Sequence, residues 1–96
     1  MTEIEHLLIC LSEECAEIQK AISKALRFGL DDGYPGGKTT NLEDIIKELN
    51  DLEGVLQLLA PKIFTFSNFS NSIEIAKKKD KVKEFMEYAK KRGTLK

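Results

Sequence analysis

The fold is set by residues 2–29, TEIEHLLICLSEECAEIQKAISKALRFG, which have the pattern of one long amphipathic helix. Their apolar residues recur in alternating steps of four and three, the spacing that places side chains on one face of an α-helix. These residues are Ile4, Leu8, Leu11, Cys15, Ile18, Ile22 and Ala25. A capping threonine precedes the run and Gly29 follows it, so we expect a helix over residues 3–28.

A second helix is expected over residues 42–59, ahead of Pro61, a residue that stops helices. Its apolar residues have the same spacing: Leu42, Ile45, Leu49, Leu52, Leu56 and Leu59. Between the two helices, residues 31–37 (DDGYPGG) are dense in turn-forming residues. They are therefore expected to form a loop.

A third helix is expected over residues 72–91, ending near Gly93, and it should be more exposed because it has fewer apolar residues. These are Ile73, Ala76, Val82, Phe85, Met86 and Ala89. Each helix is preceded by a capping box, a short polar residue with Glu three positions later: Thr2 with Glu5, Thr40 with Glu43, and Asn71 with Glu74. Residues 63–69 (IFTFSNF) have a strand-like composition, but no second strand exists to pair with them, which favours a loop or short helical turn.

Together these elements predict an all-α fold, a compact helical bundle of three main helices in one domain spanning residues 1–96. A chain this short buries a limited core by itself. With 42% hydrophobic residues, it is expected to complete that core by forming a homo-oligomer, either a dimer or a tetramer.

Composition excludes several classes of protein. The net charge of −1 argues against a nucleic-acid polymer or an anionic membrane as partner, and no apolar run is long enough to span a bilayer. The start of the chain lacks the pattern of a secretory signal. Cys10 and Cys15 lie on different faces of one helix, so neither a disulfide nor, with His6 alone, a zinc site is expected. A cytoplasmic, reduced protein is the simplest interpretation.

Two acidic pairs carry the functional argument: Glu14 with Glu17 on the first helix, and Glu48 with Asp51 on the second. Each pair is spaced by three residues, so both carboxylates lie on one side of the helix, at the shoulder of the apolar face. Like charges at this spacing repel, and a hard divalent cation such as Mg²⁺ or Mn²⁺ removes the repulsion. If the two helices pack antiparallel, four carboxylates converge. A di-iron site is disfavoured because no histidine follows His6.

At these residues the chain resembles the MazG-like superfamily of all-α nucleoside triphosphate pyrophosphohydrolases, in its short single-domain form. The family pattern is E-x-x-E on one helix and E-x-x-D on the next, matched by Glu14, Glu17, Glu48 and Asp51, with Glu13 matching a frequent additional acid. The resemblance implies Mg²⁺-dependent hydrolysis of a (deoxy)nucleoside triphosphate to the monophosphate and pyrophosphate. It implies that the four matched residues are catalytic metal ligands, assisted by Glu13. The chain departs from many relatives at Lys47, where they have a further acid.

A triphosphate also needs basic and stacking groups. Lys24 and Arg27 lie on the side of the first helix that carries Glu17, and Lys78 belongs to the basic run of the third helix; these three are the candidate phosphate contacts. Tyr34 and the phenylalanines of residues 64–69 are candidates for stacking on a base, although closing the end of the core is the favoured role for the phenylalanines.

Two hypotheses of different classes follow. The first is a nucleotide pyrophosphohydrolase acting in nucleotide-pool housekeeping or regulation. The second is a non-catalytic helical interaction module, in which the acidic pairs form structural salt bridges with lysines. Added Mg²⁺ should stabilise the first kind of protein, whereas the second should respond chiefly to ionic strength.

Overall fold

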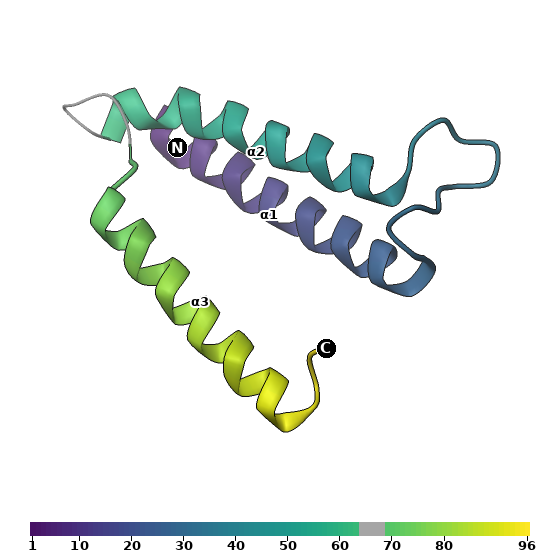
Figure 1. Cartoon of the computed structure of the whole chain (residues 1–96). Coiled ribbons are helices and arrows are strands. Elements are labelled where there is room, and N and C mark those ends of the chain that lie inside the picture. Colours follow the sequence, from purple (N-terminus) through teal and green to yellow (C-terminus); the bar gives the residue numbers. More distant parts are fainter. Residues whose placement is uncertain (64–68) are drawn as a thin grey trace.

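The computed structural model describes residues 1–63 and 69–96, which form three helices and no strand (Figure 1). Helix α1 spans Glu3–Phe28, α2 spans Asn41–Ile63 and α3 spans Ser72–Arg92. The all-α prediction is confirmed, and residues 31–37 form no helix, as expected. The prediction for residues 63–69 falls mainly on 64–68, which lie outside the described residues. Crossing a membrane needs a longer apolar run than any helix in the described ranges provides.

Capping interactions explain where the helices begin. Thr40 and Glu43 form a complete capping box before and within the first turn of α2, in which each backbone N–H donates to the other residue's side-chain oxygen at 3.1 Å. Thr2 Oγ1 accepts a hydrogen bond from the N–H of Glu5 at 3.1 Å. Asn71 Oδ1 accepts from two backbone N–H groups in the first turn of α3. These caps satisfy donors that have no partner inside the helix.

Helix α2 is longer than predicted. Pro61 lies inside its last turn and the helix continues to Ile63, so the prediction that Pro61 stops the helix is wrong. A proline removes one N–H, here the donor to the carbonyl of Gln57, and the last turn has few further bonds to lose. A proline this close to the end of a helix is therefore tolerated.

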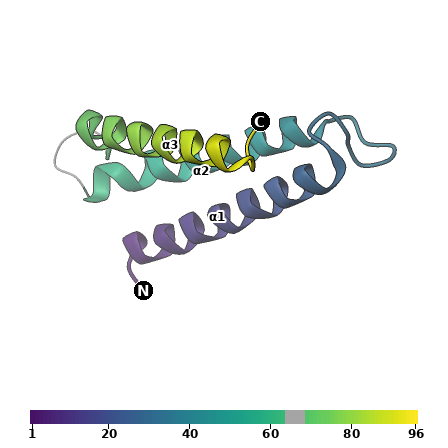
Figure 2. The same cartoon turned by 60° about the horizontal axis from the view of Figure 1, so that its bottom comes forward.

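Helices α1 and α2 pack against each other as an antiparallel hairpin (Figures 1 and 2). At one end Asn41 Nδ2 donates to the carbonyl of Gly29 at 2.8 Å, and at the other Lys62 Nζ lies 3.0 Å from Glu3 Oε2. The core between the helices is small. Within the described part of the chain, its buried residues are Ala25, Asn41, Leu59 and Ala60.

Helix α3 packs against neither helix of the hairpin within the described residues, and none of its residues is buried. Ile73 is 67% exposed and Phe85 is 58% exposed. The radius of gyration is 17.0 Å, whereas a compact chain of about 100 residues has about 13 Å. A single chain therefore does not form the compact three-helix bundle that the sequence predicts, because the apolar stripe of α3 contacts neither α1 nor α2.

Candidate metal centre

The antiparallel hairpin brings together three acidic side chains from its two helices. One carboxylate oxygen each from Glu14 on α1 and from Glu48 and Asp51 on α2 lie within 4.8 Å of one another. We call these three residues the acid cluster. Glu14 and Glu48 are half-buried and Asp51 is exposed, so the cluster sits at the edge of the hairpin core with one side open to solvent. The spacing of three residues puts Glu48 and Asp51 on one side of α2, and the pairing of the helices sets them against Glu14.

The charged form of Glu14 is disfavoured by its surroundings in the acid cluster. Desolvation raises the pKa of its carboxyl group, and the negative charges of Asp51, Glu48 and Glu17 raise it further, while Lys47 acts in the opposite direction. Its Oε2 atom is shut away from solvent and has no hydrogen-bond partner among the described residues. A buried carboxylate oxygen with no donor among the described residues is unfavourable, and a cation beside it would offset the cost of its burial.

Lys47 supplies part of the positive charge at the cluster. Its Nζ lies 2.9 Å from Asp51 Oδ2, one helical turn away, with the two side chains 69% and 43% exposed. This hydrogen bond raises the pKa of the Lys47 ammonium group, and the charges of Asp51 and Glu48 add to the effect. The ion pair is exposed and therefore contributes little to stability. Lys47 offsets only part of the repulsion that the neighbouring carboxylates exert on Glu14.

The other predicted metal ligands lie around the cluster and not in it. Glu17 is exposed and is not among the three mutually close carboxylates, although its charge acts on Glu14 and its side chain lines the adjoining groove. Glu13 is exposed on α1 and likewise lies outside the cluster. The structure thus brings together three of the four carboxylates that the paired motif selects, and metal binding by any of them stays a prediction.

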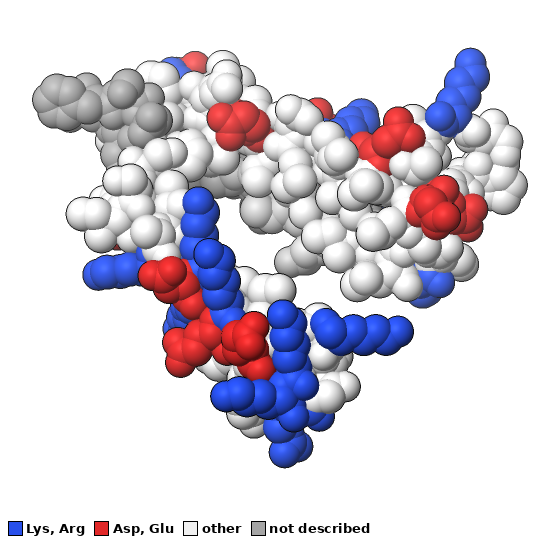
Figure 3. Space-filling view, viewed as in Figure 1, with Lys and Arg blue, Asp and Glu red and all other residues white. Residues whose placement is uncertain are grey.

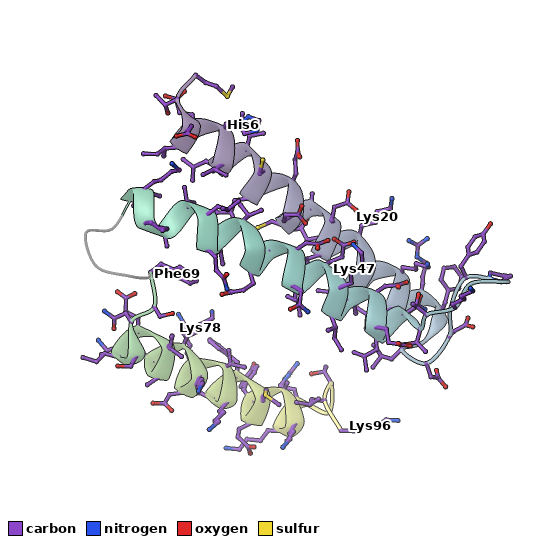
Figure 4. All side chains as sticks on the ribbon, turned by 90° about the horizontal axis from the view of Figure 1, so that it is seen from above. His6, Lys20, Lys47, Phe69, Lys78 and Lys96 are labelled. Atoms are coloured by element: carbon purple, nitrogen blue, oxygen red, sulfur yellow. The ribbon has the colours of Figure 1, made fainter. Side chains whose placement is uncertain are left out.

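A groove of about 170 Å³ adjoins the acid cluster between α1 and α2. Its charged lining residues include Glu17 and Glu48, and also Lys20, Lys24 and Lys47. Figure 4 shows Lys20 on α1 and Lys47 on α2 at the same level of the hairpin. The groove therefore places ammonium groups next to carboxylates, which suits an anionic ligand bound together with a divalent cation. We call it the phosphate groove, for the group that its chemistry fits.

The predicted phosphate contacts have different outcomes. Lys24 is half-buried and lines the phosphate groove. Arg27 is exposed and its guanidinium carbon lies 5.6 Å from the ring centroid of Phe28, a cation–π contact outside the groove. Lys78 lies on α3 (Figure 4), which does not pack on the hairpin, so a single chain does not bring it to the acid cluster.

Sequence reasoning missed Lys20, Lys47 and Asn41 as parts of the site. The spacing of Lys47 four residues before Asp51 was a usable signal, since it predicts an ion pair along the helix. Lys20 follows Glu17 by three residues, which places both on one side of α1. Asn41 gives no such signal, because its burial depends on how the loop folds against the start of α2.

The residues of the cluster fit Mg²⁺ or Mn²⁺ by their chemistry. These ions prefer oxygen ligands, and Mg²⁺ is usually held by one or two carboxylates, several waters and a phosphate of the substrate. Three carboxylates with one open side meet that requirement, and one of them carries a buried oxygen that has no hydrogen-bond partner in residues 1–63 and 69–96. Comparisons with protein-family models, with curated proteins and with solved structures found no match.

Proposed function

We propose that the chain is a Mg²⁺-dependent nucleoside triphosphate pyrophosphohydrolase of the MazG-like type, which converts a (deoxy)nucleoside triphosphate to the monophosphate and pyrophosphate. The observation that carries the proposal is the meeting of Glu14, Glu48 and Asp51, whose carboxylate oxygens lie within 4.8 Å of one another. The resemblance of the E-x-x-E and E-x-x-D motifs to that superfamily supports the same assignment. Mn²⁺ is the alternative ion, because it takes the same ligands.

The residues of the acid cluster have the role of holding the cation. A bound Mg²⁺ would neutralise phosphate charge and would make a water at the site more acidic and therefore a better nucleophile. The bond that breaks lies between the α-phosphorus and the oxygen that bridges to the β-phosphate, and pyrophosphate leaves. Glu17, outside the cluster but lining the phosphate groove, is suited to accept the proton of the attacking water.

Lysines have the role of holding the triphosphate. Lys20 and Lys24 line the phosphate groove, and their ammonium groups offset charge on the phosphates that the cation leaves unpaired. Lys47 is held by Asp51 and can exchange that partner for a phosphate oxygen, since both accept the same charge-assisted hydrogen bond. This side chain takes the place of the further acid found in many relatives.

Oligomerisation is part of the proposal, with a second copy of the chain as the partner. Residues 1–63 contain twelve acidic and six basic residues, a net charge of −6, and residues 69–96 contain nine basic and four acidic residues, a net charge of +5. Figure 3 shows Lys and Arg side chains gathered over α3, with a smaller number of acidic side chains among them. Both parts also carry exposed apolar side chains, such as Leu49 and Ile46 on α2 and Phe85 on α3, which association could bury. The opposite net charges of the two parts favour the same association. We propose that α3 of one chain covers the hairpin of another.

The oligomer is tested by size-exclusion chromatography with light scattering. The wild-type chain should elute as a dimer or tetramer, and Phe85→Asp should shift it toward the monomer, because a charge at that position opposes burial. Circular dichroism should show unchanged helix content, since Phe85 is 58% exposed in the single chain. A wild-type monomer at tens of micromolar concentration would contradict this part of the proposal.

The alternative function is a helical interaction module in which the acids are structural. The ion pair between Lys47 and Asp51 favours it, because it gives one acid of the cluster a partner without any metal. It leaves Glu14 Oε2 without a partner among the described residues, however, and for that reason we prefer the enzyme.

The enzyme is tested with a panel of nucleoside triphosphates and Mg²⁺, with monophosphate, diphosphate and pyrophosphate measured separately by ion-exchange chromatography. Equal amounts of monophosphate and pyrophosphate are expected, and EDTA should abolish their release. Asp51→Asn and Glu48→Gln should lower the rate at least 100-fold, because each removes a ligand oxygen's charge. Glu53→Gln is the matched control, since Glu53 lies on α2 outside the cluster and should not affect the rate. Full activity in both cluster variants, or no turnover of any triphosphate, would contradict the assignment.

A further inference from the structure

A second groove, of about 310 Å³, lies beside the phosphate groove, between the end of α1 and the loop that follows it. Lys24 and Asn41 line both grooves, so the two are neighbours along the hairpin. The remaining lining residues of the second groove are Phe28, Asp32, Gly33, Tyr34 and Pro35. Its lining is therefore largely apolar and aromatic, unlike that of the phosphate groove.

The aromatic side chains of the second groove are open to solvent. Tyr34 is 73% exposed and Phe28 is 59% exposed, and Pro35 adds a flat apolar surface beside them. Exposed aromatic rings next to a cavity offer planar faces on which another ring can stack. A nucleobase is a planar ring that fits such a surface.

The loop that carries Tyr34 is held in place by backbone hydrogen bonds. The N–H of Asn41 donates to the carbonyl of Asp32 at 2.7 Å, and the N–H of Gly37 donates to the carbonyl of Tyr34 at 2.7 Å. A Cβ atom at Gly33 would overlap the carbonyl of Thr39, so the close approach of these two segments of the loop requires glycine. The second groove is therefore built before any ligand arrives.

Asn41 gives an independent sign of a ligand at the junction of the two grooves. Only 1% of the residue is exposed, and its Nδ2 donates to the carbonyl of Gly29 at 2.8 Å, which fixes the orientation of the amide. Its Oδ1 is buried and has no hydrogen-bond partner among the described residues. Buried acceptors are normally paired, so this oxygen is suited to receive an O–H or N–H from a bound molecule.

We propose that the second groove binds the nucleoside part of the substrate, with the base against Tyr34 and Phe28 and a sugar hydroxyl donating to Asn41 Oδ1. The order of groups in a nucleoside triphosphate is phosphates, sugar and base. The order along the hairpin is the same: the acid cluster with its lysines, then Asn41, then the aromatic side chains. This inference rests on the proposed function, because the triphosphate must first lie in the phosphate groove.

The test is isothermal titration calorimetry of the full chain in Mg²⁺ with two kinds of ligand. One is the set of four α,β-methylene deoxynucleoside triphosphates, which cannot be cleaved at the proposed bond, and the other is inorganic tripolyphosphate. At least one nucleotide should bind ten or more times tighter than tripolyphosphate. Tyr34→Ala should remove about tenfold from the nucleotide affinity and leave tripolyphosphate binding unchanged, since only the nucleotide stacks.

Two variants and one analogue make the test specific. Tyr34→Phe keeps the ring and should retain most of the nucleotide affinity. Tyr88→Ala removes the exposed tyrosine of α3, which is 61% exposed against 73% for Tyr34, and it should affect neither ligand. The 2′,3′-dideoxy form of the tightest nucleotide should bind about tenfold more weakly, because it has no hydroxyl for Asn41. Binding of tripolyphosphate without any preference for a nucleotide, or equal losses for both ligands in Tyr34→Ala, would overturn this inference alone. Failure of both ligands to bind would overturn it together with the proposed function.

Discussion

Replacement of Glu14 by Gln tests the acid cluster through thermal stability. The charge of Glu14 opposes folding in the absence of a cation, and in the proposed site it helps to bind one when the ion is present. Glu14 is half-buried beside Glu48 and Asp51, and its pKa is raised by desolvation and by their charges. Without metal, the neutral variant should melt at or above the temperature of the wild type. With Mg²⁺ the order should reverse, since the variant has lost one of the three carboxylates proposed to hold the ion.

The size of the reversal follows from the coupling between binding and folding. With Mg²⁺ at about 100 times its Kd, one bound ion stabilises the wild type by about 2.7 kcal/mol. For a chain of about 100 residues, this raises the Tm by about 10–20 °C. A loss of about 100-fold in affinity brings the same Mg²⁺ concentration down to about one Kd, where the gain falls to about 0.4 kcal/mol and the Tm rises by about 2–3 °C.

The assay is differential scanning fluorimetry in EDTA and across a Mg²⁺ titration, at constant ionic strength. Glu53→Gln removes the same charge from a surface position on α2 outside the cluster, so it should keep the full response to Mg²⁺. The reasoning is refuted if Glu14→Gln responds to Mg²⁺ as strongly as the wild type does. It is also refuted if neither protein responds while raised NaCl stabilises both, as a salt-sensitive interaction module would require.

Three further predictions concern the rest of the chain. Because the pKa of Glu14 is raised in the folded state, Glu14 contributes its full share of metal-free stability below its ordinary pKa of 4.5 and loses it as the pH rises through its folded-state pKa. Urea unfolding in EDTA should therefore show the free energy of unfolding of the wild type falling over that pH range relative to Glu14→Gln. Gly29→Ala should destabilise the chain by about 1–3 kcal/mol, because φ is 106° at this residue. Gly54→Ala, on an open helix surface, should instead stabilise it by about 0.5–1 kcal/mol. Chemical denaturation that shifts the free energy of unfolding in the same direction for both variants contradicts the backbone argument. Leu59→Ala removes a side chain that is only 5% exposed and should cost about 2–5 kcal/mol, measured by the same unfolding curves, and a loss below 1 kcal/mol would show that the hairpin core is not formed as described.

The helices were predictable because their signals are local. Thr40 and Glu43 lie three residues apart and form the expected capping box, and Gly29 ends α1 where the sequence places it. The prediction that Pro61 ends the second helix failed because the effect of a proline depends on how many helical hydrogen bonds follow it. Helix α2 ends at Ile63, two residues after Pro61. The small number of apolar residues in α3 predicted its exposure, but not its separation from the hairpin. An apolar stripe is the same in sequence whether its neighbour belongs to its own chain or to another.

The candidate site was predictable to the extent that helical spacing determines it. Glu48 and Asp51 share a side of α2 by their spacing, and an antiparallel partner brings Glu14 to them. Glu17 lies outside the three close carboxylates because the packing of two helices, and not the spacing within one, determines which side chains meet. The second groove was not predictable beyond the suggestion of Tyr34, because its walls depend on loop hydrogen bonds such as that between Asn41 and Asp32.

The central claim is that the three carboxylates of the acid cluster hold one divalent cation between them. Titration of the protein with Mn²⁺, followed by electron paramagnetic resonance of the free ion, measures this binding without any substrate. We expect saturable binding that Mg²⁺ displaces, that Asp51→Asn abolishes and that Glu53→Gln leaves intact. If all the Mn²⁺ stays free at protein concentrations of several hundred micromolar, or if Asp51→Asn binds it as the wild type does, the cluster is no metal centre.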